Sequence, residues 1–360
     1  MTAHSHDVVV VGAGAGGGAA AWALSKFGVK VLLLESGPEY DPFKDFKLHQ
    51  DDWEKQVFPA KRRGLSRGYR MARLQALDEQ WQNLRSWNAV SGLQVASSRR
   101  HPGRYHHVRG LGGSTLHFTG EAHRMHPRAM TMHRDFGVAA DWPVLYDELE
   151  SYYQQAEQLV GVAGPASAAE RPRSQPYPLK EHPPCYASQH IMAATNELEL
   201  SWSANPLAVL SRPYDDRPGC NYCNNCGRGC PRTDKGSVDV TFLRHARASG
   251  NCTVVTGANV IFIEAGPDDV VRSIRYIDSD DMEHKINTRC LVVAGGAVMT
   301  PRLLLASKNS TASDGLANES GQVGRHFMET HYWSSSGLHP QALGSHQRPP
   351  EWHPVRCTTS

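Results

Sequence analysis

The sequence predicts an α/β protein built around a parallel sheet, and three observations lead to this prediction. An apolar strand at residues 8–11 runs into a glycine-rich turn at 12–17, and a helix-forming run follows. A second apolar strand at 31–34 ends in Glu35. A third apolar run at 290–294 again leads into glycines, so the sheet is resumed about 280 residues after it begins. This order of strand, glycine turn, helix and acid-terminated strand is typical of a βαβ unit that binds a dinucleotide.

Each glycine of the first turn has a mechanical role in such a unit. Gly12 permits the tight turn out of the strand, Gly14 lets the backbone approach a pyrophosphate, and Gly17 lets the helix pack closely on the sheet. The amides at the start of the helix then face the phosphates, at the positive end of the helix dipole. Glu35 is placed to accept hydrogen bonds from a ribose diol. The alternative is a plain glycine-rich βα turn without a ligand.

Composition limits the class of protein. A chain of 360 residues has room for one large α/β domain with a smaller partner, or for about two or three ordinary domains. Hydrophobic residues make up 40% and charged residues 21%, a globular composition without any apolar run long enough for a transmembrane segment. The net charge of +2 is too small to indicate a nucleic-acid partner. The N-terminus enters the first strand at once, which leaves no room for a secretory signal and makes the cytoplasm the default location.

The first half of the chain carries few periodic elements after the opening unit. Residues 18–28 are rich in small helix formers and end at Gly28, a C-terminal cap. Residues 38–104 are polar and aromatic and are predicted to be excursions with short helices rather than a core layer. Their basic residues indicate a nucleic-acid patch or, in better agreement with the small net charge, a solvated or partner-facing surface. These basic residues are Lys61, Arg62, Arg63, Arg67, Arg70 and Arg73.

A second glycine-rich segment occupies residues 108–117. Its centre, Gly112-Gly113-Ser114-Thr115, either brings backbone amides against another phosphate or an isoalloxazine ring, or is simply a loop. An acidic amphipathic helix is predicted from 150 to 160, led in by residues 141–149 and ended by Gly161. A buried stripe on it would comprise Tyr146, Leu149, Tyr153 and Ala156. Residues 163–184 are predicted to be a loop or linker.

The second half returns to strand patterns. Residues 253–278 alternate between apolar and polar side chains, which favours strands and a hairpin. Cys290 opens the apolar strand that ends at residue 294, and this cysteine is most simply a small buried hydrophobe. Thr300-Pro301 then opens a predicted helix with proline at its first position. Residues 335–360 show no periodicity.

Several segments accompany the first glycine turn in a fixed order. They are Gly112 to Thr115, Trp142-Pro143 before the helix, the strand around Val260, residues 296–307 and residues 321–325. The run Gly-Ala-Val-Met-Thr-Pro-Arg-Leu-Leu-Leu-Ala-Ser at 296–307 is the most specific of them. With this ordered set the chain resembles the glucose-methanol-choline (GMC) family of flavin oxidoreductases over most of residues 7–331.

The resemblance implies a fold and a domain organisation. The expected architecture is α/β: a Rossmann-like FAD-binding domain of GMC type with an inserted, incomplete α+β substrate domain. The FAD-binding domain would be discontinuous and comprise residues 1–37, 105–125 and 220–331. Residues 38–104 and 126–219 would be excursions and a substrate-side insertion, and 332–360 the start of a truncated substrate domain.

The resemblance also implies FAD as the bound dinucleotide and an activity. The family oxidises an alcohol, polyol or sugar to a carbonyl by hydride transfer to the flavin. The implied pyrophosphate, ribose, flavin and adenine contacts fall on Gly12, Gly14, Gly17, Glu35, Ser36, Gly112, Gly113, Ser114, Thr115, Val260 and Gly295. An NAD-linked enzyme that shares only the glycine turn is a further alternative, against which the segment 296–307 argues.

The chain departs from the family pattern in three places. Ser114-Thr115-Leu116-His117-Phe118 stands where many members carry Ser-Ser and then Asn, which indicates a branch resembling the gluconate and sorbitol dehydrogenase flavoproteins. Lys308 stands where glycine is usual. The family's catalytic histidine and its His or Asn partner would lie beyond residue 360, so no catalytic residue is assigned. The expectation is a truncated reading frame, with a non-catalytic FAD-binding fragment as the alternative to an active enzyme.

Four cysteines stand close together in the sequence at Cys220, Cys223, Cys226 and Cys230, followed by Pro231. The spacing C-x2-C-x2-C-x3-C-P is that of bacterial ferredoxin loops, because two-residue spacers let thiolates converge on one cluster. A [3Fe-4S] or [4Fe-4S] cluster is the leading hypothesis. The alternatives are a tetrahedral zinc site and thiols or disulfides that stabilise a loop.

Residues 235–243 resemble the family's stretch that enters a helix near the flavin, which would place the cysteines beside the cofactor. A cluster there would relay electrons from the flavin to an external acceptor. The implied partners are an alcohol or sugar substrate, a small subunit and a cytochrome-type acceptor, with periplasmic export alongside a signal-bearing partner as the alternative location. Nineteen histidines are present, many between 101 and 133, but their spacing gives little support to a three-histidine metal site.

Overall fold

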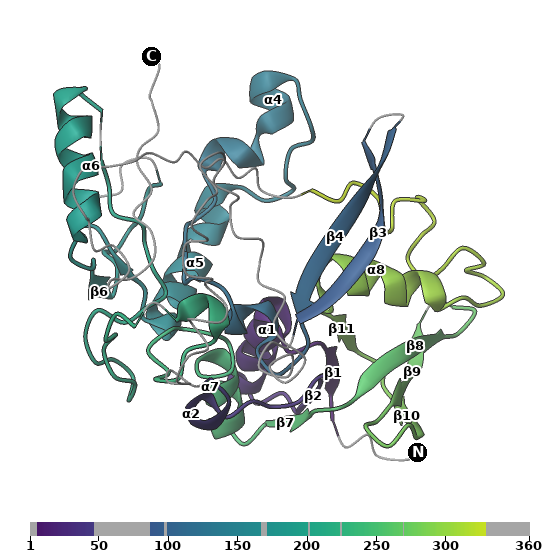
Figure 1. Cartoon of the computed structure of the whole chain (residues 1–360). Helices are drawn as coiled ribbons and strands as arrows, with labels where there is room; N and C mark the ends of the chain where they lie inside the picture. The colour runs from purple at the N-terminus through teal and green to yellow at the C-terminus, as the bar shows by residue number, and fades with distance from the viewer. Residues whose placement is uncertain are drawn as a thin grey trace, which may run out of the picture.

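The computed structural model describes residues 6–46, 87–96, 99–166, 171–200, 202–223, 225–268 and 270–328. Its centre is a parallel sheet with strand order β11-β1-β2-β7 (Figure 1). These strands are β1 (Val8–Val11), β2 (Val31–Leu34), β7 (Cys252–Val255) and β11 (Leu291–Val293). Val9 pairs with Leu291 on one side and with Leu32 on the other. The prediction that a late strand rejoins the N-terminal sheet is therefore confirmed.

The first two strands are apolar throughout because both faces of the sheet are covered. Val8 and Val10 pack into one cluster of buried side chains, while Val9 and Val11 pack into the cluster on the opposite face. Residues of β2 divide between the two clusters in the same alternating way. Such continuous apolar runs are expected of parallel strands with covered faces.

Helices cover the first face of the sheet. Helix α1 (Ala15–Lys26) follows the glycine turn directly, and Gly28 after it has a φ of +83°, as expected of a C-terminal glycine cap. Helix α7 (Phe242–Ala248) packs beside α1, with the rings of Trp22 and Phe242 edge to face at 5.7 Å. The helix predicted over residues 18–28 is thus confirmed, although it begins three residues earlier.

A smaller antiparallel sheet and a helix cover the second face. The strands β8 (Asn259–Ala265), β9 (Val271–Ile277) and β10 (Glu283–Asn287) form this sheet, and α8 (Gly296–Ala306) lies against it (Figure 1). The hairpin predicted within 253–278 is β8–β9. The predicted start of the last helix was wrong, since α8 begins at Gly296 and Pro301 lies inside it. A helix tolerates this proline at the cost of one i→i−4 hydrogen bond, here the one to Ala297.

The region 38–104 contains more regular structure than the sequence predicted. A short helix, α2 (Pro42–Asp45), is followed after a stretch outside the described residues by a long antiparallel hairpin. Its strands are β3 (Trp87–Ala96) and β4 (Arg99–Val108), with Trp87 opposite Val108. In Figure 1 the hairpin projects from the sheet next to α8. The basic residues 61–73 lie outside the described part of the chain.

The remaining elements lie between β4 and β7 in the sequence. They are the 3-10 turns η2 (Gly113–Leu116), η3 (Pro127–Met130) and η4 (Cys226–Arg228), the helices α4 (Met132–Phe136), α5 (Tyr146–Val160) and α6 (Tyr186–Glu197), and the two-residue strands β5 (Ala163–Gly164) and β6 (Leu179–Lys180). The predicted amphipathic helix is α5, and it ends at Gly161 with a φ of +79°.

Buried charge, rather than apolar packing alone, fixes α5. Arg124 is 2% exposed and donates to both carboxylate oxygens of Glu157, at 2.7 and 2.9 Å, and to Glu150 at 2.8 Å. Tyr146 and Tyr153 from the predicted stripe stack 6.0 Å apart beside this arginine, which lies over the Tyr153 ring. These contacts attach the segment around Arg124 to α5.

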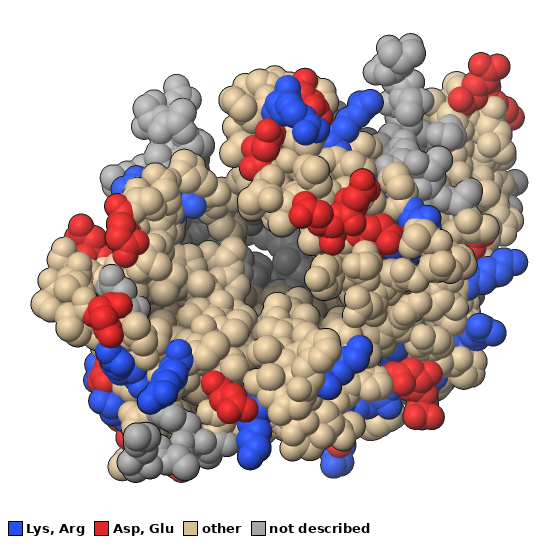
Figure 2. All heavy atoms as spheres, turned by 180° about the vertical axis from the view of Figure 1, so that it is seen from behind, with Lys and Arg blue, Asp and Glu red and all other residues tan. Residues whose placement is uncertain are grey.

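The parallel sheet unites chain segments near residues 8–34, 252–255 and 291–293, as a discontinuous domain requires. The predicted domain boundaries stay a prediction, and residues 332–360 lie outside the described residues. Lys, Arg, Asp and Glu side chains are interspersed over the face shown in Figure 2, which is hollowed near its middle. Among the helices that the structure describes, none has the length and apolarity needed to span a bilayer.

Candidate functional site

A cavity of about 740 Å³ opens at the carboxyl ends of the parallel strands. Its floor is formed where β1, β2 and β11 end, at Val11, Leu34 and Val293. The turns that follow these strands form its walls together with η2, the start of β8 and the first turns of α8. Ligands of open α/β sheets bind at this end of the strands, and pockets for such ligands commonly measure 300 to 1,000 Å³.

The first glycine turn forms one wall and is too close-packed for side chains. Gly12 has a φ of +97°, and a Cβ added there would lie 2.6 Å from the carbonyl oxygen of Ala294 in the turn after β11. A Cβ at Gly17 would lie 1.8 Å from the carbonyl oxygen of Gly12. These contacts explain why the turn needs glycine. They also bring the amino end of α1 to the edge of the cavity, where its unpaired amides favour an anion.

Glu35 lies at the end of β2 and is oriented by the backbone. One carboxylate oxygen accepts a hydrogen bond from the amide of Ala13 and the other from the amide of Gly37, both at 2.9 Å. The side chain is 6% exposed, and burial raises the pKa of Glu35 while the amide hydrogen bonds oppose the rise. The Gly37-bonded oxygen also accepts from the Ser36 hydroxyl at 3.3 Å. The other oxygen keeps a further lone pair, so the carboxylate can accept from a ribose hydroxyl while it holds the turn.

The second glycine-rich segment meets the first across the cavity. Gly113 has a φ of +55°, and a Cβ there would lie 2.7 Å from the Cα of Gly14. The amide of Gly112 donates to the carbonyl oxygen of Ala13 at 3.0 Å. Thr115 holds the segment in shape, because its hydroxyl donates to the carbonyl of Gly112 at 2.6 Å and accepts from the amide of Val238 at 3.0 Å. Two glycine turns about 100 residues apart therefore form one cradle.

Most of the predicted cofactor-binding residues line this cavity. They are Gly12, Gly14, Glu35, Ser36, Gly113, Ser114, Thr115, Val260 and Gly295. Gly17 and Gly112 do not line it. Both lie next to the lining residues, where a Cβ would be too close to neighbouring atoms. That these residues bind a cofactor stays a prediction.

The cavity also contains residues that the sequence did not assign to cofactor binding. They include His107, Arg109, Met299, Thr300 and Arg302. Burial and the neighbouring charge of Arg109 lower the pKa of His107. Arg109 and Arg302 give the cavity a positive lining suited to a pyrophosphate. Their only signal in the sequence is that each lies within a recognised motif, Arg109 in the glycine-rich segment 108–117 and Arg302 in the run 296–307.

Comparison with known proteins shows which family this chain belongs to. The model of the family described as GMC oxidoreductase matches residues 80–331, which is more than half of the chain. The chain belongs to the GMC oxidoreductase family. An NAD(P)-binding Rossmann-like domain also matches residues 10–40, the glycine turn and β2. The resemblance inferred from the sequence motifs is thus confirmed, and so is the Rossmann-like α/β fold.

Known GMC relatives are similar over most of this chain. The fructose dehydrogenase large subunit of Gluconobacter japonicus is 29% identical over 328 residues, which cover 90% of this chain and 58% of that protein. The gluconate 2-dehydrogenase flavoprotein of Pantoea cypripedii is 25% identical, over 89% of this chain and 55% of that one. Pyridoxine 4-oxidase from Mesorbium loti has a similar fold, with a TM-score of 0.53 at 19% identity over 84% of this chain and 52% of that one. The chain therefore spans about half the length of these relatives.

The residues present fit FAD, the cofactor of GMC oxidoreductases. The amino end of α1, the two interlocked glycine turns and the arginines suit its pyrophosphate, and Glu35 suits its adenosine ribose. The expected adenine contact, Val260 in β8, lines the same cavity. This fit depends on glycines that leave no room for a Cβ, so it follows from the backbone as much as from side chains.

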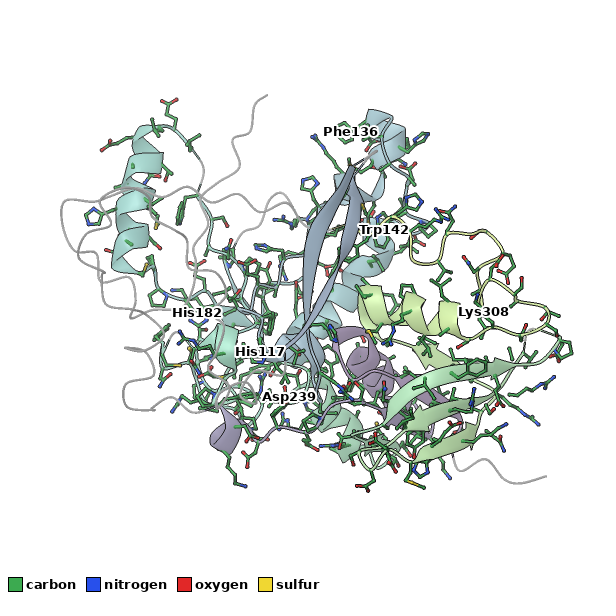
Figure 3. All side chains as sticks on the ribbon, turned by 45° about the vertical axis from the view of Figure 1, so that its right-hand side comes forward. His117, Phe136, Trp142, His182, Asp239 and Lys308 are labelled. Carbon is green, nitrogen blue, oxygen red and sulfur yellow. The ribbon has the colours of Figure 1, made fainter. Side chains whose placement is uncertain are left out.

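The cysteine segment, residues 220–231, lies behind the second glycine segment. A Cβ at Gly229 would lie 2.3 Å from the ring of Phe46, and that ring is 6.2 Å from the ring of His117. Figure 3 shows His117 and Asp239 at the foot of the β3–β4 hairpin. The expectation that the cysteines lie near the cofactor site is consistent with these contacts.

The four thiols do not form a metal-binding group in this structure. Among the residues it describes, no three His, Cys, Asp or Glu side chains are arranged to hold a metal ion. Cys230 donates to Asp234 at 3.0 Å, and the Cys220 sulfur accepts from the amide of Tyr222 at 3.3 Å. Burial raises the pKa of Cys226 to about 11 and of Cys230 to about 12, which favours the protonated thiol at both positions. The predicted iron–sulfur cluster is therefore not shown, and none of the described cysteines forms a disulfide.

Proposed function

We propose that this protein is a dehydrogenase that oxidises the CH–OH group of a sugar, polyol or related alcohol with FAD as the hydride acceptor. The observation that carries the proposal is the cavity in which both glycine turns and the oriented carboxylate of Glu35 meet. Bound FAD would supply the acceptor for the hydride that leaves the alcohol carbon.

The residues of this chain have binding and positioning roles in that reaction. The amides at the start of α1 would face the negative charge of the pyrophosphate, and Arg109 and Arg302 would neutralise it further. Glu35 would hold the ribose, and the backbone of residues 113–115 would close the other side. None of the described residues is assigned as the base that takes the proton of the alcohol.

The proposed substrate class follows from the relatives. Fructose and gluconate, named in the relatives above, are both polyhydroxylated carbon chains with secondary alcohols. We expect this protein to act on a compound of that kind. An oxidase that passes electrons to dioxygen is the competing possibility within the same family.

Anaerobic mixing with candidate substrates tests this function. The FAD-loaded protein is mixed with fructose, gluconate, sorbitol or glucose, and the flavin absorbance is followed. One of these compounds should bleach the flavin, whereas its analogue methylated at the reacting hydroxyl should not. Turnover with an artificial dye as electron acceptor, without turnover when dioxygen is the only acceptor, would identify a dehydrogenase. Full FAD occupancy without bleaching by any polyol would contradict the proposal and favour a non-catalytic FAD-binding fragment.

We further propose that an iron–sulfur cluster at the cysteine segment passes electrons to an external acceptor. The ferredoxin-like spacing of Cys220, Cys223, Cys226 and Cys230 supports this, as does the contact of the segment with the region of His117. Binding would require the thiols to deprotonate and converge, as metal binding generally does.

Elemental analysis tests the cluster. Protein reconstituted anaerobically with iron and sulfide should hold iron and acid-labile sulfide, and Cys226→Ser should lose both. Cys290→Ser, at an exposed position away from the quartet, is the matched control and should keep them. Zinc alone, or no metal, would rule out the relay. A cytochrome-type acceptor and a small subunit are the proposed partners, and a haem spectrum in material that co-purifies with the tagged chain is the check.

A further inference from the structure

Lys235 is the most deeply buried charged group in the described part of the chain, with an exposed fraction of 0%. Its ammonium group donates three hydrogen bonds: to the carbonyl oxygens of Leu116 at 2.8 Å, Phe118 at 3.0 Å and Cys226 at 2.8 Å. A lysine has three donors, so its hydrogen-bonding capacity is used completely. All three acceptors are backbone groups, which makes Lys235 a connector of chain segments rather than a partner in an ion pair.

The three carbonyls belong to two segments that are far apart in the sequence. Leu116 directly follows Thr115, which lines the FAD cavity, and Phe118 lies two residues further on. Cys226 is the third cysteine of the ferredoxin-like run. The ammonium therefore spans the boundary between the wall of the cavity and the cysteine segment.

Both ends of Lys235 are fixed. Its backbone pairs with Val209 in an isolated antiparallel bridge, and the neighbouring Gly236 amide donates to the carbonyl of Ala208 at 2.8 Å. The side chain lies over the ring of Phe118, 5.2 Å from its centroid. A displacement of the carbonyl of Phe118 or of Cys226 must therefore strain the hydrogen bonds of this lysine.

The residues after Lys235 extend the connection to the nucleotide turn. The Val238 amide donates to the Thr115 hydroxyl, and the Val238 side chain fills the space where a Cβ of Gly18 in α1 would lie, 2.2 Å away. Asp239 lies 3.4 Å from the Cβ position of Gly112. Residues 235–239 thus contact the cysteine segment, the second glycine segment and α1 in succession.

A buried ammonium is costly, which argues that this one has a role beyond filling space. Moving a charged group out of water costs several kcal/mol unless hydrogen bonds and nearby charges compensate. Burial lowers the pKa of Lys235. An apolar side chain of the same length would fill the site without this cost, but it would leave three carbonyls without their donor.

We propose that Lys235 is a positioning residue that couples the cysteine segment to the wall of the FAD cavity, so that binding of FAD and the ordering of the cysteine segment strengthen each other. This rests on the assignment of FAD to the cavity and not on any substrate. Coupling between two sites is reciprocal: whatever the cysteine segment gains from FAD, FAD gains from an ordered cysteine segment.

Hydrogen–deuterium exchange tests the coupling without turnover. Amide exchange of the purified protein is compared with and without saturating FAD in two peptides, residues 112–118 and 221–230. In the wild type both should exchange more slowly with FAD, the second by roughly 5-fold or more, the low end of typical coupling between sites. In Lys235→Met, FAD should still protect 112–118, while the protection of 221–230 should disappear.

Two further variants make the result specific. Lys235→Arg keeps a buried donor and should restore part of the remote protection. Lys308→Met removes an exposed lysine just beyond the C-terminal end of α8 (Figure 3) and should behave as the wild type. Unchanged remote protection in Lys235→Met would overturn the proposal. So would wild-type protein in which FAD protects 112–118 alone, a result that stands even if the methionine variant does not fold. Failure of the FAD assignment would differ from both, because 112–118 would then remain unprotected too.

Discussion

At the scale of single residues, Glu35 combines a structural and a ligand-binding task. Its two oxygens accept from the amides of Ala13 and Gly37, on either side of the junction between the first turn and β2. Burial alone would favour the protonated acid, and the two amide donors favour the carboxylate. The ribose would thus meet a carboxylate that is already oriented, so little ordering is required on binding.

The first prediction concerns this carboxylate. Glu35→Gln keeps the shape but turns an amide group toward a backbone N–H, so one hydrogen bond is replaced by two opposed donors. We expect the Kd for FAD to rise by about 10- to 100-fold, equivalent to about 1.4 to 2.8 kcal/mol. Titration followed by flavin fluorescence measures it. Glu39→Gln, at a half-exposed residue paired with Arg247, is the control and should leave the Kd unchanged. Equal affinities in the two variants would refute the role given to Glu35.

A second prediction separates backbone strain from close packing. Gly113 and Gly137 have similar φ angles, +55° and +68°, but a Cβ meets the Cα of Gly14 at 2.7 Å in the first case and nothing within 4 Å in the second. Gly137→Ala should lower the free energy of unfolding by about 1 kcal/mol, the usual cost of alanine in this conformation, without any effect on FAD.

Gly113→Ala should in addition separate the two glycine turns and weaken FAD binding by at least about 100-fold, since a small misplacement of a positioned backbone is costly. Urea unfolding and FAD titration of both variants distinguish the two effects. The same FAD affinity in both would show that the contact between Gly113 and Gly14 does not matter for the cofactor.

At the scale of secondary-structure elements, the attachment of α5 depends on titratable groups. The hydrogen bond from Arg124, helped by the amide of Ser174, lowers the pKa of Glu150 to about 2. A carboxyl with a lowered pKa stabilises the fold above its ordinary pKa, and this contribution disappears as the pH falls toward the folded-state value. The contribution of Glu150 is therefore complete at neutral pH and is lost between about pH 4.5 and pH 2.

The third prediction follows from this titration. Glu150→Gln should reduce the stability at pH 7 and flatten the loss of stability between pH 4.5 and pH 2, because the variant has no proton to take up there. Urea unfolding at a series of pH values measures it. Glu197→Gln, at the exposed end of α6, should retain the wild-type pH dependence. An unchanged slope in Glu150→Gln would show that other carboxyls dominate this pH range.

The sequence predicts some of the helices and strands but not others. The turn from β1 into α1 was predictable because apolar strands, glycines and helix formers are adjacent in the sequence. The β3–β4 hairpin was missed because β4 carries three arginines, three histidines, a proline and a glycine, a composition typical of loops. The sequence misplaces the start of α8 because proline favours the first helical position, whereas the tertiary fold tolerates Pro301 inside the helix.

At the scale of the whole molecule, the cavity depends on the closure of the parallel sheet, so its ligand should stabilise the entire fold. FAD at about 100 times its Kd adds about 2.7 kcal/mol to the free energy of unfolding. For a chain of 360 residues we expect Tm to rise by about 4 °C. The same concentration of NAD should leave Tm unchanged, as followed by far-UV circular dichroism. Equal stabilisation by NAD would contradict the assignment of the cavity to FAD.

The residues of the candidate site also fall into those that the sequence predicts and those that it does not. Gly12, Glu35 and Gly113 were predictable because fixed spacings in the sequence express backbone requirements. Arg302 and His107 were not, since their presence in the cavity depends on how α8 and the hairpin lie against the sheet. The burial of Arg124 was equally unpredictable, because the acids that neutralise it, Glu150 and Glu157, are 26 and 33 residues away in the sequence.

The pairing of β1 with β11 has a consequence for synthesis. Val9 leaves the ribosome early, but its partner Leu291 is made about 280 residues later, which at 5 to 20 residues per second is roughly 15 to 55 s. During that interval one edge of β1 has exposed backbone hydrogen-bonding groups, the kind of edge that pairs with wrong strands. A nascent chain of this protein should therefore depend on chaperones until β11 emerges, and only then acquire its flavin.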